Sequence, residues 1–231
     1  MGLRSMIVSI GQPAYLPWLG YFQRIVRSDV HVVLDHVQFE RHSNVNRNEI
    51  LVNDRRHWLT VPVKTARLGL NIAICDLEIA YASNWPRKHL ATIIQSYHGT
   101  PGLSDAVELI SEPLNKRDRF LTELVADINA RMFEYLNVTT PVVLSSSLGV
   151  KSANSQLVLE ICQKMGASVY LSGGMGRNYL DLETFRSAGI EVEFHEFKPL
   201  PYTQRSDTFV PRLSALDAIC NLGTEAIKAV R

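Results

Sequence analysis

Short apolar runs alternate with amphipathic stretches along the first part of the chain. Residues 6–10 (MIVSI) are apolar and partly β-branched, which predicts a strand. Pro13 and Pro17 prevent this strand from continuing, because each lacks an N–H and has a fixed φ. A helix is predicted over residues 20–28 and a second strand over residues 30–34. The N-terminal segment is therefore expected to form a strand–loop–helix–strand unit.

The same alternation returns in the second half of the chain. Strands are predicted there over residues 142–144, 168–171 and 190–197, and they alternate with helices predicted over residues 152–165 and 182–187. Strands that alternate with helices imply right-handed crossovers and a parallel sheet. We therefore expect an open, mostly parallel, Rossmann-like α/β sheet formed by residues 5–36 and 138–197.

The middle of the chain follows another pattern. It predicts a β-hairpin of residues 50–52 with 57–63 and a further strand over residues 72–79. Two amphipathic helices are predicted over residues 85–97 and 119–136. The tail from residue 214 predicts one or two short helices. Residues 1–231 are thus expected to form a single α/β domain, with residues 50–136 as an insertion or cap on the sheet.

Charge and cysteine usage narrow the class of protein. Lys and Arg total 24 against 23 Asp and Glu, so no overall field favours nucleic acid or an anionic membrane. Cys75, Cys162 and Cys220 lie far apart in apolar stretches and are expected to be buried small side chains. The first apolar run is too short for a signal peptide, and no window reaches the length of a membrane span. A cytoplasmic protein without a transmembrane segment is expected.

The loop after the first strand is rich in aromatic and amide side chains. Gln12 follows the strand, and Tyr15, Trp18 and Tyr21 offer flat surfaces with polar tips that suit stacking on a sugar or base. Ligands bind just past the carboxyl ends of strands in α/β sheets, so these four residues are candidates for substrate binding. A packed hydrophobic loop is the alternative.

A second group of polar residues follows the second strand. Asp35, at the end of that strand, is a candidate proton acceptor or hydroxyl-binding group, and Gln38 lies close by in sequence. Arg47 can bind phosphate or carboxylate bidentately, and Asn46 and Asn48 flank it. An ordinary loop rich in turn-forming residues is the alternative.

A third candidate is the loop SGGMGRN at residues 172–178, between a predicted strand and a predicted helix. Ser172, Gly173 and Gly174 would let backbone N–H groups approach an anion such as phosphate. The loop matches neither the Walker A pattern nor GxGxxG. An ordinary strand-to-helix turn is the alternative.

His89 is the candidate general base, because it lies in the basic cluster Arg87-Lys88-His89 on a predicted helix. A surface or core-edge histidine is the alternative. The histidines show neither HxxxH nor HxH spacing, so no metal site is predicted. The chain has no GxSxG motif, which argues against Ser-His-Asp hydrolysis.

Nearly the whole chain carries a series of segments in a fixed order: QPAYLPWLGYFQRIVRSD, LDHVQF, NRN, WLTVPVK, KHL, YLSGGMGRNYLD, AGIEVEF and LSALDAICNLG. In these segments it resembles the WbqC-like protein family. Members of that family are associated with bacterial surface-polysaccharide (O-antigen), other glycan and natural-product gene clusters. The resemblance implies a role for Asp35 and Gln38. Position 36 departs from the pattern, since this chain has His36 where relatives tend to have Asp.

The resemblance also implies ligand-binding roles for Tyr179, Tyr202 and Gln204. The last two lie in the loop after the final predicted strand, which either closes over the site or packs against the protein. At the level of fold, the N-terminal unit is similar to nucleotidylyltransferase-like domains. Those enzymes have histidines where this chain has Trp18 and Tyr21, which argues against ordinary nucleotidyl transfer.

These features predict a transferase of surface-glycan or related small-molecule biosynthesis. It would transfer an acyl or aminoacyl group to an amino or hydroxyl group of a nucleotide-activated sugar, with His89 or Asp35 as proton acceptor. No cofactor is predicted, and the donor would be acyl-CoA or a thioester on a carrier protein. The alternatives are a non-catalytic glycan- or nucleotide-binding accessory protein and a metal-dependent nucleotidyl or phosphoryl transferase, which needs carboxylates such as Asp35 and Asp181 to converge.

Overall fold

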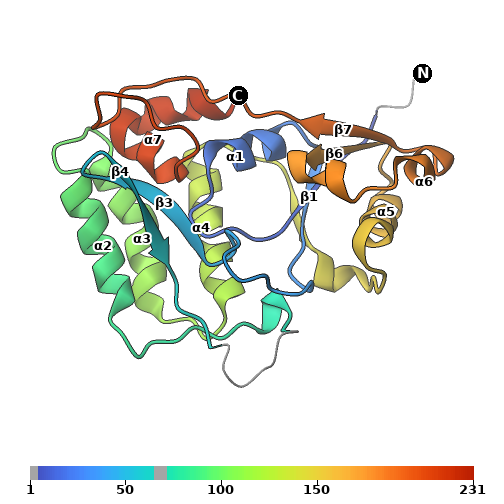
Figure 1. The fold of residues 1–231 in the computed structure, drawn as a ribbon, viewed down its shortest axis with the longest axis horizontal. Coiled ribbons are helices and arrows are strands. Elements are labelled where there is room, and N and C mark those ends of the chain that lie inside the picture. Colours follow the sequence, from blue (N-terminus) through green and yellow to red (C-terminus); the bar gives the residue numbers. More distant parts are fainter. Residues whose placement is uncertain (1–4, 65–71) are drawn as a thin grey trace. The chain divides into compact units, whose positions relative to one another are not determined.

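The structure is a computed structural model that describes residues 5–64 and 72–231 (Figure 1). The chain divides into two compact units. Unit 1 comprises Met1–Gln12, Gln23–His36 and Thr139–Lys198, and unit 2 comprises Pro13–Phe22, Val37–Val138 and Pro199–Arg231. The single domain with residues 50–136 as a cap stays a prediction.

Unit 1 is built on a parallel sheet of five strands, in the order β5-β2-β1-β6-β7 (Figure 1). In that order they are Val142–Leu144, Val30–Val33, Ile7–Gly11, Val169–Gly173 and Glu191–His195. Every neighbouring pair is parallel. The predicted fold class, an α/β protein with an open and mostly parallel sheet, is therefore confirmed.

The two central strands are apolar because both of their faces are covered. Val8 and Ile10 of β1 are buried, as are Tyr170 and Leu171 of β6. The helical elements of unit 1 are η2 (Ser145–Leu148), α5 (Asn154–Lys164), η3 (Gly174–Asn178) and α6 (Leu182–Ser187). Helix α1 (Leu19–Val26) begins among residues of unit 2, and its last residues, from Gln23 onward, belong to unit 1.

Unit 2 contains the predicted β-hairpin. Strands β3 (Arg47–Val52) and β4 (Arg55–Thr60) are antiparallel. Asn53 and Asp54 form the turn with φ values of 47° and 61°. A two-residue turn that matches the twist of its strands needs this left-handed backbone, which Asn and Asp tolerate better than other side chains.

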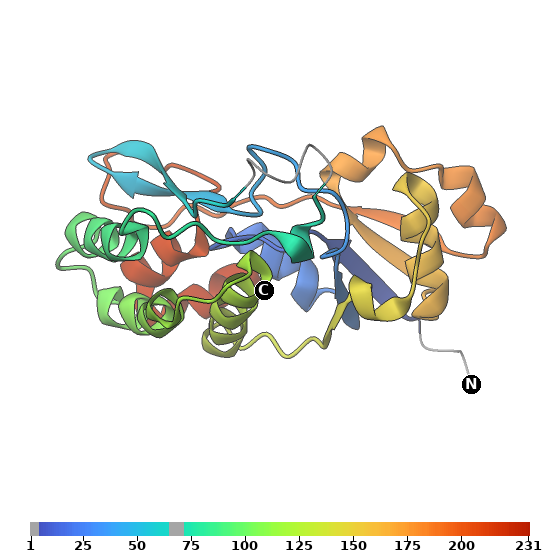
Figure 2. The same ribbon diagram turned by 90° about the horizontal axis from the view of Figure 1, so that it is seen from below.

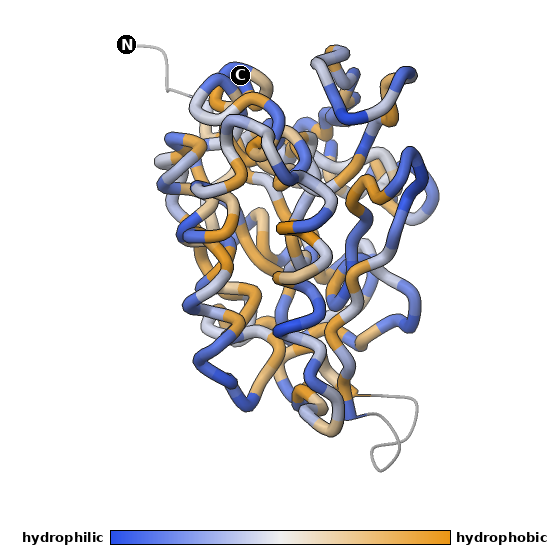
Figure 3. The backbone as a smooth tube through the Cα atoms, turned by 90° about the vertical axis from the view of Figure 1, so that its left-hand side faces the viewer, coloured by the Kyte–Doolittle hydropathy of each residue, from blue (hydrophilic) through white to orange (hydrophobic). Residues whose placement is uncertain are grey.

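The helices of unit 2 are α2 (Trp85–Ser96), α3 (Leu103–Lys116), α4 (Leu121–Tyr135), α7 (Ala215–Leu222), and the short η1 (Ile74–Asp76) and η4 (Gly223–Val230). Helix α3 packs beside α2, α4 and α7 (Figures 1 and 2). Hydrophobic residues recur along these helices between hydrophilic ones (Figure 3), and Ile93, Ile110, Ile128 and Ile219 are fully buried. No helix in the described ranges is both long and apolar enough to span a membrane.

Two expectations in the middle of the chain are corrected by the structure. Residues 72–79 were expected to form a strand, but they form η1 flanked by isolated bridges, such as Val63 with Ile79. Their apolar side chains are buried, but their backbone pairs in isolated bridges and not along a neighbouring strand. No helix was expected at residues 103–116, where α3 lies with Pro113 in its last turn. Among the cysteines, Cys162 and Cys220 are buried as expected, whereas Cys75 is half-buried.

Candidate functional site

The carboxyl edge of the unit 1 sheet contains a topological switch point. β2 extends the sheet on one side of β1, whereas β6 and β7 extend it on the other. Ligands of open α/β sheets bind in the crevice outside the strand ends at such a point. Gln12 follows β1 directly, and Gly174 follows β6 directly. Two of the predicted loops therefore start from neighbouring strand ends.

The strand register leaves a gap in the row of side chains at this edge. The pairing of β1 with β6, continued to its end, brings Gly11 opposite Gly173. Val33 flanks Gly11, and His195 flanks Gly173. Residues in one row point to the same face of a sheet. The two central positions thus carry no side chain between a valine and a histidine.

The guanidinium of Arg24 lies over this gap. A methyl group added to Gly11 would lie 2.5 Å from Nη2 of Arg24, and one added to Gly173 would lie 2.6 Å from Nη1. Arg24 was not among the residues predicted from the sequence. A single arginine in an amphipathic helix is an ordinary surface residue by pattern, and only its place in the helix after the first strand could have suggested a role.

Two histidines at this edge are held uncharged. The ring of His31 is fully buried, and its Nδ1 lies 2.8 Å from the Ser9 hydroxyl. Burial, and then the charge of Arg24, lower the pKa of His31 well below its ordinary value. Burial, Arg24 and Arg27 lower the pKa of His195 to about 4. At neutral pH the positive charge of this edge therefore belongs to the arginines.

The predicted glycine-rich loop continues β6 into η3. Ser172 is buried, and its hydroxyl donates to the Gly173 carbonyl at 3.0 Å. A methyl group added to Gly176 would lie 2.1 Å from Ser172 Oγ, so glycine is needed for the turn to pack over the serine. Tyr179 is half-exposed, and burial of part of its side chain raises its pKa. This loop lies at the same edge as Arg24.

Asp35 joins the ends of β2 and β5. Its Oδ1 accepts from the Ser145 hydroxyl and the Ser146 N–H, both at 2.9 Å, and its Oδ2 accepts from the Ser146 hydroxyl at 2.6 Å. Asp181 instead caps α6 by accepting from Thr184. Among the described residues no three His, Cys, Asp or Glu side chains are grouped as metal ligands are.

In unit 2, the structure pairs His89 with Tyr15. The two side chains are buried, and the Tyr15 hydroxyl lies 2.9 Å from His89 Nδ1. The Trp85 ring packs against the His89 ring with a centroid separation of 5.1 Å. Burial lowers the pKa of His89 to about 4. The imidazole is therefore neutral at pH 7 and belongs to the packed interior of unit 2; its catalytic role stays a prediction.

This burial makes stability depend on pH. The pKa of His89 is about 4 in the folded protein against an ordinary 6.5, so the unfolded chain binds the proton more tightly. The contribution of His89 is complete above pH 6.5 and is lost as the pH falls toward 4. Between pH 7.5 and pH 5 we expect a loss of about 2 kcal/mol. Urea unfolding of His89→Gln should show a smaller loss than the original chain, whereas exposed His98→Gln should match it.

Three predicted aromatic residues lie in unit 2 and differ in exposure. Tyr15 and Tyr21 are buried, while Trp18 is half-buried and meets Tyr21 edge to face at a centroid distance of 5.9 Å. The burial of the two tyrosines supports the packed-loop alternative for them. Trp18 keeps part of its surface exposed, and its ligand-binding role stays a prediction.

The residues around Arg47 mostly serve the fold of the hairpin. Asn46 donates to the Val61 carbonyl at 2.9 Å, and Asn48 donates to the Leu16 carbonyl at 2.7 Å. Arg47 donates to the His42 carbonyl at 2.7 Å, and its guanidinium lies 4.1 Å from the centre of the half-exposed Trp58 ring. A cavity of about 350 Å³ next to them is lined by Phe39, Arg41, His42, Asn46, Arg47, Thr60 and Val63. Gln38 forms an isolated bridge with Ala73.

Tyr202 and Gln204, which the family resemblance implied as ligand-binding residues, hold a buried carboxylate. Asp217 of α7 is fully buried and accepts from the hydroxyls of Tyr97 at 2.8 Å and Tyr202 at 2.6 Å. Gln204 donates to it at 2.7 Å. Burial raises the pKa of Asp217, and these hydrogen bonds oppose the rise. Within unit 2 the loop thus packs against α7 through both side chains.

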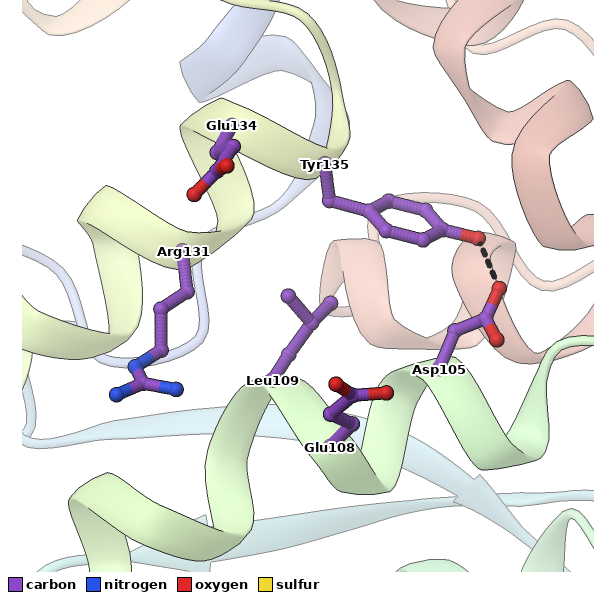
Figure 4. A pocket seen from close by; sticks show the side chains of 6 residues that line it. All are labelled: Asp105, Glu108, Leu109, Arg131, Glu134 and Tyr135. Carbon is purple, nitrogen blue, oxygen red and sulfur yellow. Dashed lines mark hydrogen bonds between the residues drawn. The ribbon is translucent and has the colours of Figure 1, made fainter.

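A further cavity, of about 420 Å³, lies between α3 and α4 of unit 2 (Figure 4). Its lining residues are Asp105, Glu108, Leu109, Arg131, Glu134 and Tyr135. The Tyr135 hydroxyl donates to Asp105 at 2.7 Å across the cavity. Arg131 is ion-paired with Asp127 and Glu112. The sequence analysis selected none of these residues, and their carboxylates alone identify no ligand.

The amino-acid sequence is similar to those of known proteins. A sequence model described as the WbqC-like protein family matches residues 12–229. The chain is 26% identical over 222 residues to the uncharacterized protein Rv1507c of Mycobacterium tuberculosis (strain ATCC 25618 / H37Rv). The aligned region covers 95% of each of the two chains. No solved structure matches the chain.

Proposed function

We propose that this chain, which belongs to the WbqC-like protein family, is a group transferase that acts on a small molecule. It transfers an acyl or aminoacyl group to an amino or hydroxyl group of a nucleotide-activated sugar. In this proposal the product serves bacterial surface-glycan synthesis, the donor is acyl-CoA or a thioester on a carrier protein, and the reaction takes place in the cytoplasm.

The observation that carries the proposal is the carboxyl edge of the unit 1 sheet. The switch point between β1 and β6 has a cation, Arg24, over two residues without side chains, Gly11 and Gly173. This is the position at which open α/β sheets bind small ligands. Transfer to a nucleotide-activated sugar needs a site that holds the diphosphate of this acceptor, and the positive charge of this edge supports that role.

Asp35 is the proton acceptor in this proposal. It lies two residues after the end of β2, the strand that neighbours β1 in the same unit, and therefore at the same edge of the sheet. The attacking amino or hydroxyl group would give up its proton to a carboxylate oxygen as it bonds to the acyl carbon. The C–S bond of the thioester would then break, and the departing thiolate would take up a proton. Its three hydrogen bonds from Ser145 and Ser146 hold the carboxylate in one orientation.

A non-catalytic binding protein is the second candidate, and the same hydrogen bonds favour it. All three donors belong to the protein itself, so Asp35 has a structural role in joining the ends of β2 and β5 that requires no catalytic role. A binding protein would use the Arg24 edge and need no proton acceptor.

The two candidates differ in product formation. The full chain is incubated with a UDP-amino sugar and an acyl- or aminoacyl-thioester, and mass spectrometry follows the acceptor. For a transferase we expect the acceptor to gain the acyl group, and Asp35→Asn to lower turnover about 100-fold or more without weakening acceptor binding. Ser147→Ala, at an exposed serine of η2, is the matched control. Tight binding without any product would favour the binding protein.

A further inference from the structure

Arg24 is a half-buried cation for which the described part of the chain supplies no counter-ion. Its Nε is buried without a hydrogen-bond partner. Within residues 5–64 and 72–231, no carboxylate or carbonyl pairs with its guanidinium. Burying a charged donor without a partner costs stability, and such costs are typical of functional positions. The fold alone therefore does not account for this arginine.

The fork of the guanidinium is directed to the ends of two adjacent strands. Nη2 lies against Gly11 and Nη1 against Gly173, at distances that would not admit a methyl group on either residue. Two parallel N–H groups on a planar fork match two oxygens of one anion. Glycine at both strand ends leaves room for the guanidinium itself to lie close to the backbone.

The charges around Arg24 favour an anion. His31 and His195, on the strands that flank β1 and β6, are neutral at pH 7 because burial and Arg24 lower their pKa values. Arg27 adds a second positive charge that acts on His195. Glu196, which follows β7, is ion-paired with Arg177 at 3.1 Å. The Tyr179 hydroxyl is close enough for Arg24 to lower its pKa, although burial raises that pKa overall.

We infer that Arg24, with Gly11 and Gly173, forms a phosphate-binding subsite at the carboxyl edge of unit 1. The inference rests on the proposed function for the molecule that carries the phosphate, which is the diphosphate of a nucleotide-activated sugar. The guanidinium binds two oxygens of one phosphate, and the two glycines let the guanidinium lie against the strand ends. The half-exposed Tyr179 lies at the same edge and is available to contact the rest of the ligand.

Isothermal titration calorimetry of the full chain at pH 7.5 tests the subsite, with UDP and inorganic pyrophosphate as probes. Loss of a charged, bidentate contact in Arg24→Gln is expected to weaken binding of both probes about 10- to 100-fold. Lys164→Gln removes an exposed charge from the last turn of α5, before β6 begins, and is expected to change affinity less than about threefold. Equal affinities in the original chain and Arg24→Gln would overturn the inference, as would tighter binding of malonate than of pyrophosphate.

A second variant keeps the test valid if Arg24→Gln fails to fold. Gly173→Ala keeps the arginine, but its methyl group displaces only the flexible end of that side chain, so the fold is retained. Weaker pyrophosphate binding in Gly173→Ala is expected, and unchanged binding would contradict the subsite. Binding that depends on Arg24 without any transfer product would leave the subsite in place and remove the transferase proposal.

Discussion

Replacing Asp217 by alanine is expected to lower the free energy of unfolding by about 3–5 kcal/mol. The carboxylate accepts hydrogen bonds from Tyr97, Tyr202 and Gln204 inside unit 2. Without it, three donors directed at one buried point lose their acceptor, and a buried polar group without a partner costs its full desolvation energy. Urea unfolding followed by circular dichroism measures the change.

Two further variants distinguish the contribution of this hydrogen-bond network to stability from the effect of removing a charge. Tyr202→Phe removes one of the three donors and is expected to cost about 1 kcal/mol. Asp207→Ala removes an exposed carboxylate from the same C-terminal segment and is expected to stay within about 0.5 kcal/mol of the original chain. A loss below about 1 kcal/mol for Asp217→Ala would show that the network contributes little to stability.

Gly102→Ala is expected to destabilise unit 2 by about 3 kcal/mol through overpacking. Gly102 precedes α3 and donates its N–H to the Cys220 carbonyl of α7 at 2.9 Å. A methyl group there would lie 2.0 Å from the Ile219 carbonyl oxygen and 2.7 Å from Gly223 Cα. Both contacts are with backbone, so α3 and α7 must separate to admit the new side chain.

Thermal unfolding tests this substitution. For a chain of this size, a loss of about 3 kcal/mol corresponds to a fall in Tm of about 6–12 °C. Gly174→Ala is the matched control, because a methyl group at Gly174 meets no atom within 4 Å. A Tm of Gly102→Ala within 2 °C of the control, roughly 0.5–1 kcal/mol, would mean that α3 and α7 do not approach as closely as described.

The strands and most helices were predictable because each carries its own local signal. The apolar, partly β-branched runs around Val8 and Val169 became the paired central strands β1 and β6. The turn at Asn53 and Asp54 also carried its own signal, since both residues accept a positive φ. Helix α3 and η1 were not predicted, because their conformations depend on the elements that they pack against.

The candidate site was predicted less well, because residue type alone does not separate a ligand-binding side chain from one that serves the fold. Asn46 and Asn48 looked like ligand-binding amides, but each donates to a backbone carbonyl of its own unit. Arg24 carried no pattern in the sequence. It became a candidate only when the register of β1 and β6 brought Gly11 and Gly173 together beneath it.

The sequence by itself determined the class of fold, the strands of the parallel sheet, the β-hairpin and the resemblance to the WbqC-like family. Periodicity, turn residues and motifs act over short stretches, so one chain is enough to reveal them. Only the tertiary structure decided which polar side chains are free to meet a ligand. Tyr202 and Gln204 are held by Asp217, whereas Arg24 has no partner among the described residues. Satisfying a buried polar group is a property of residues that are distant in sequence and close in space.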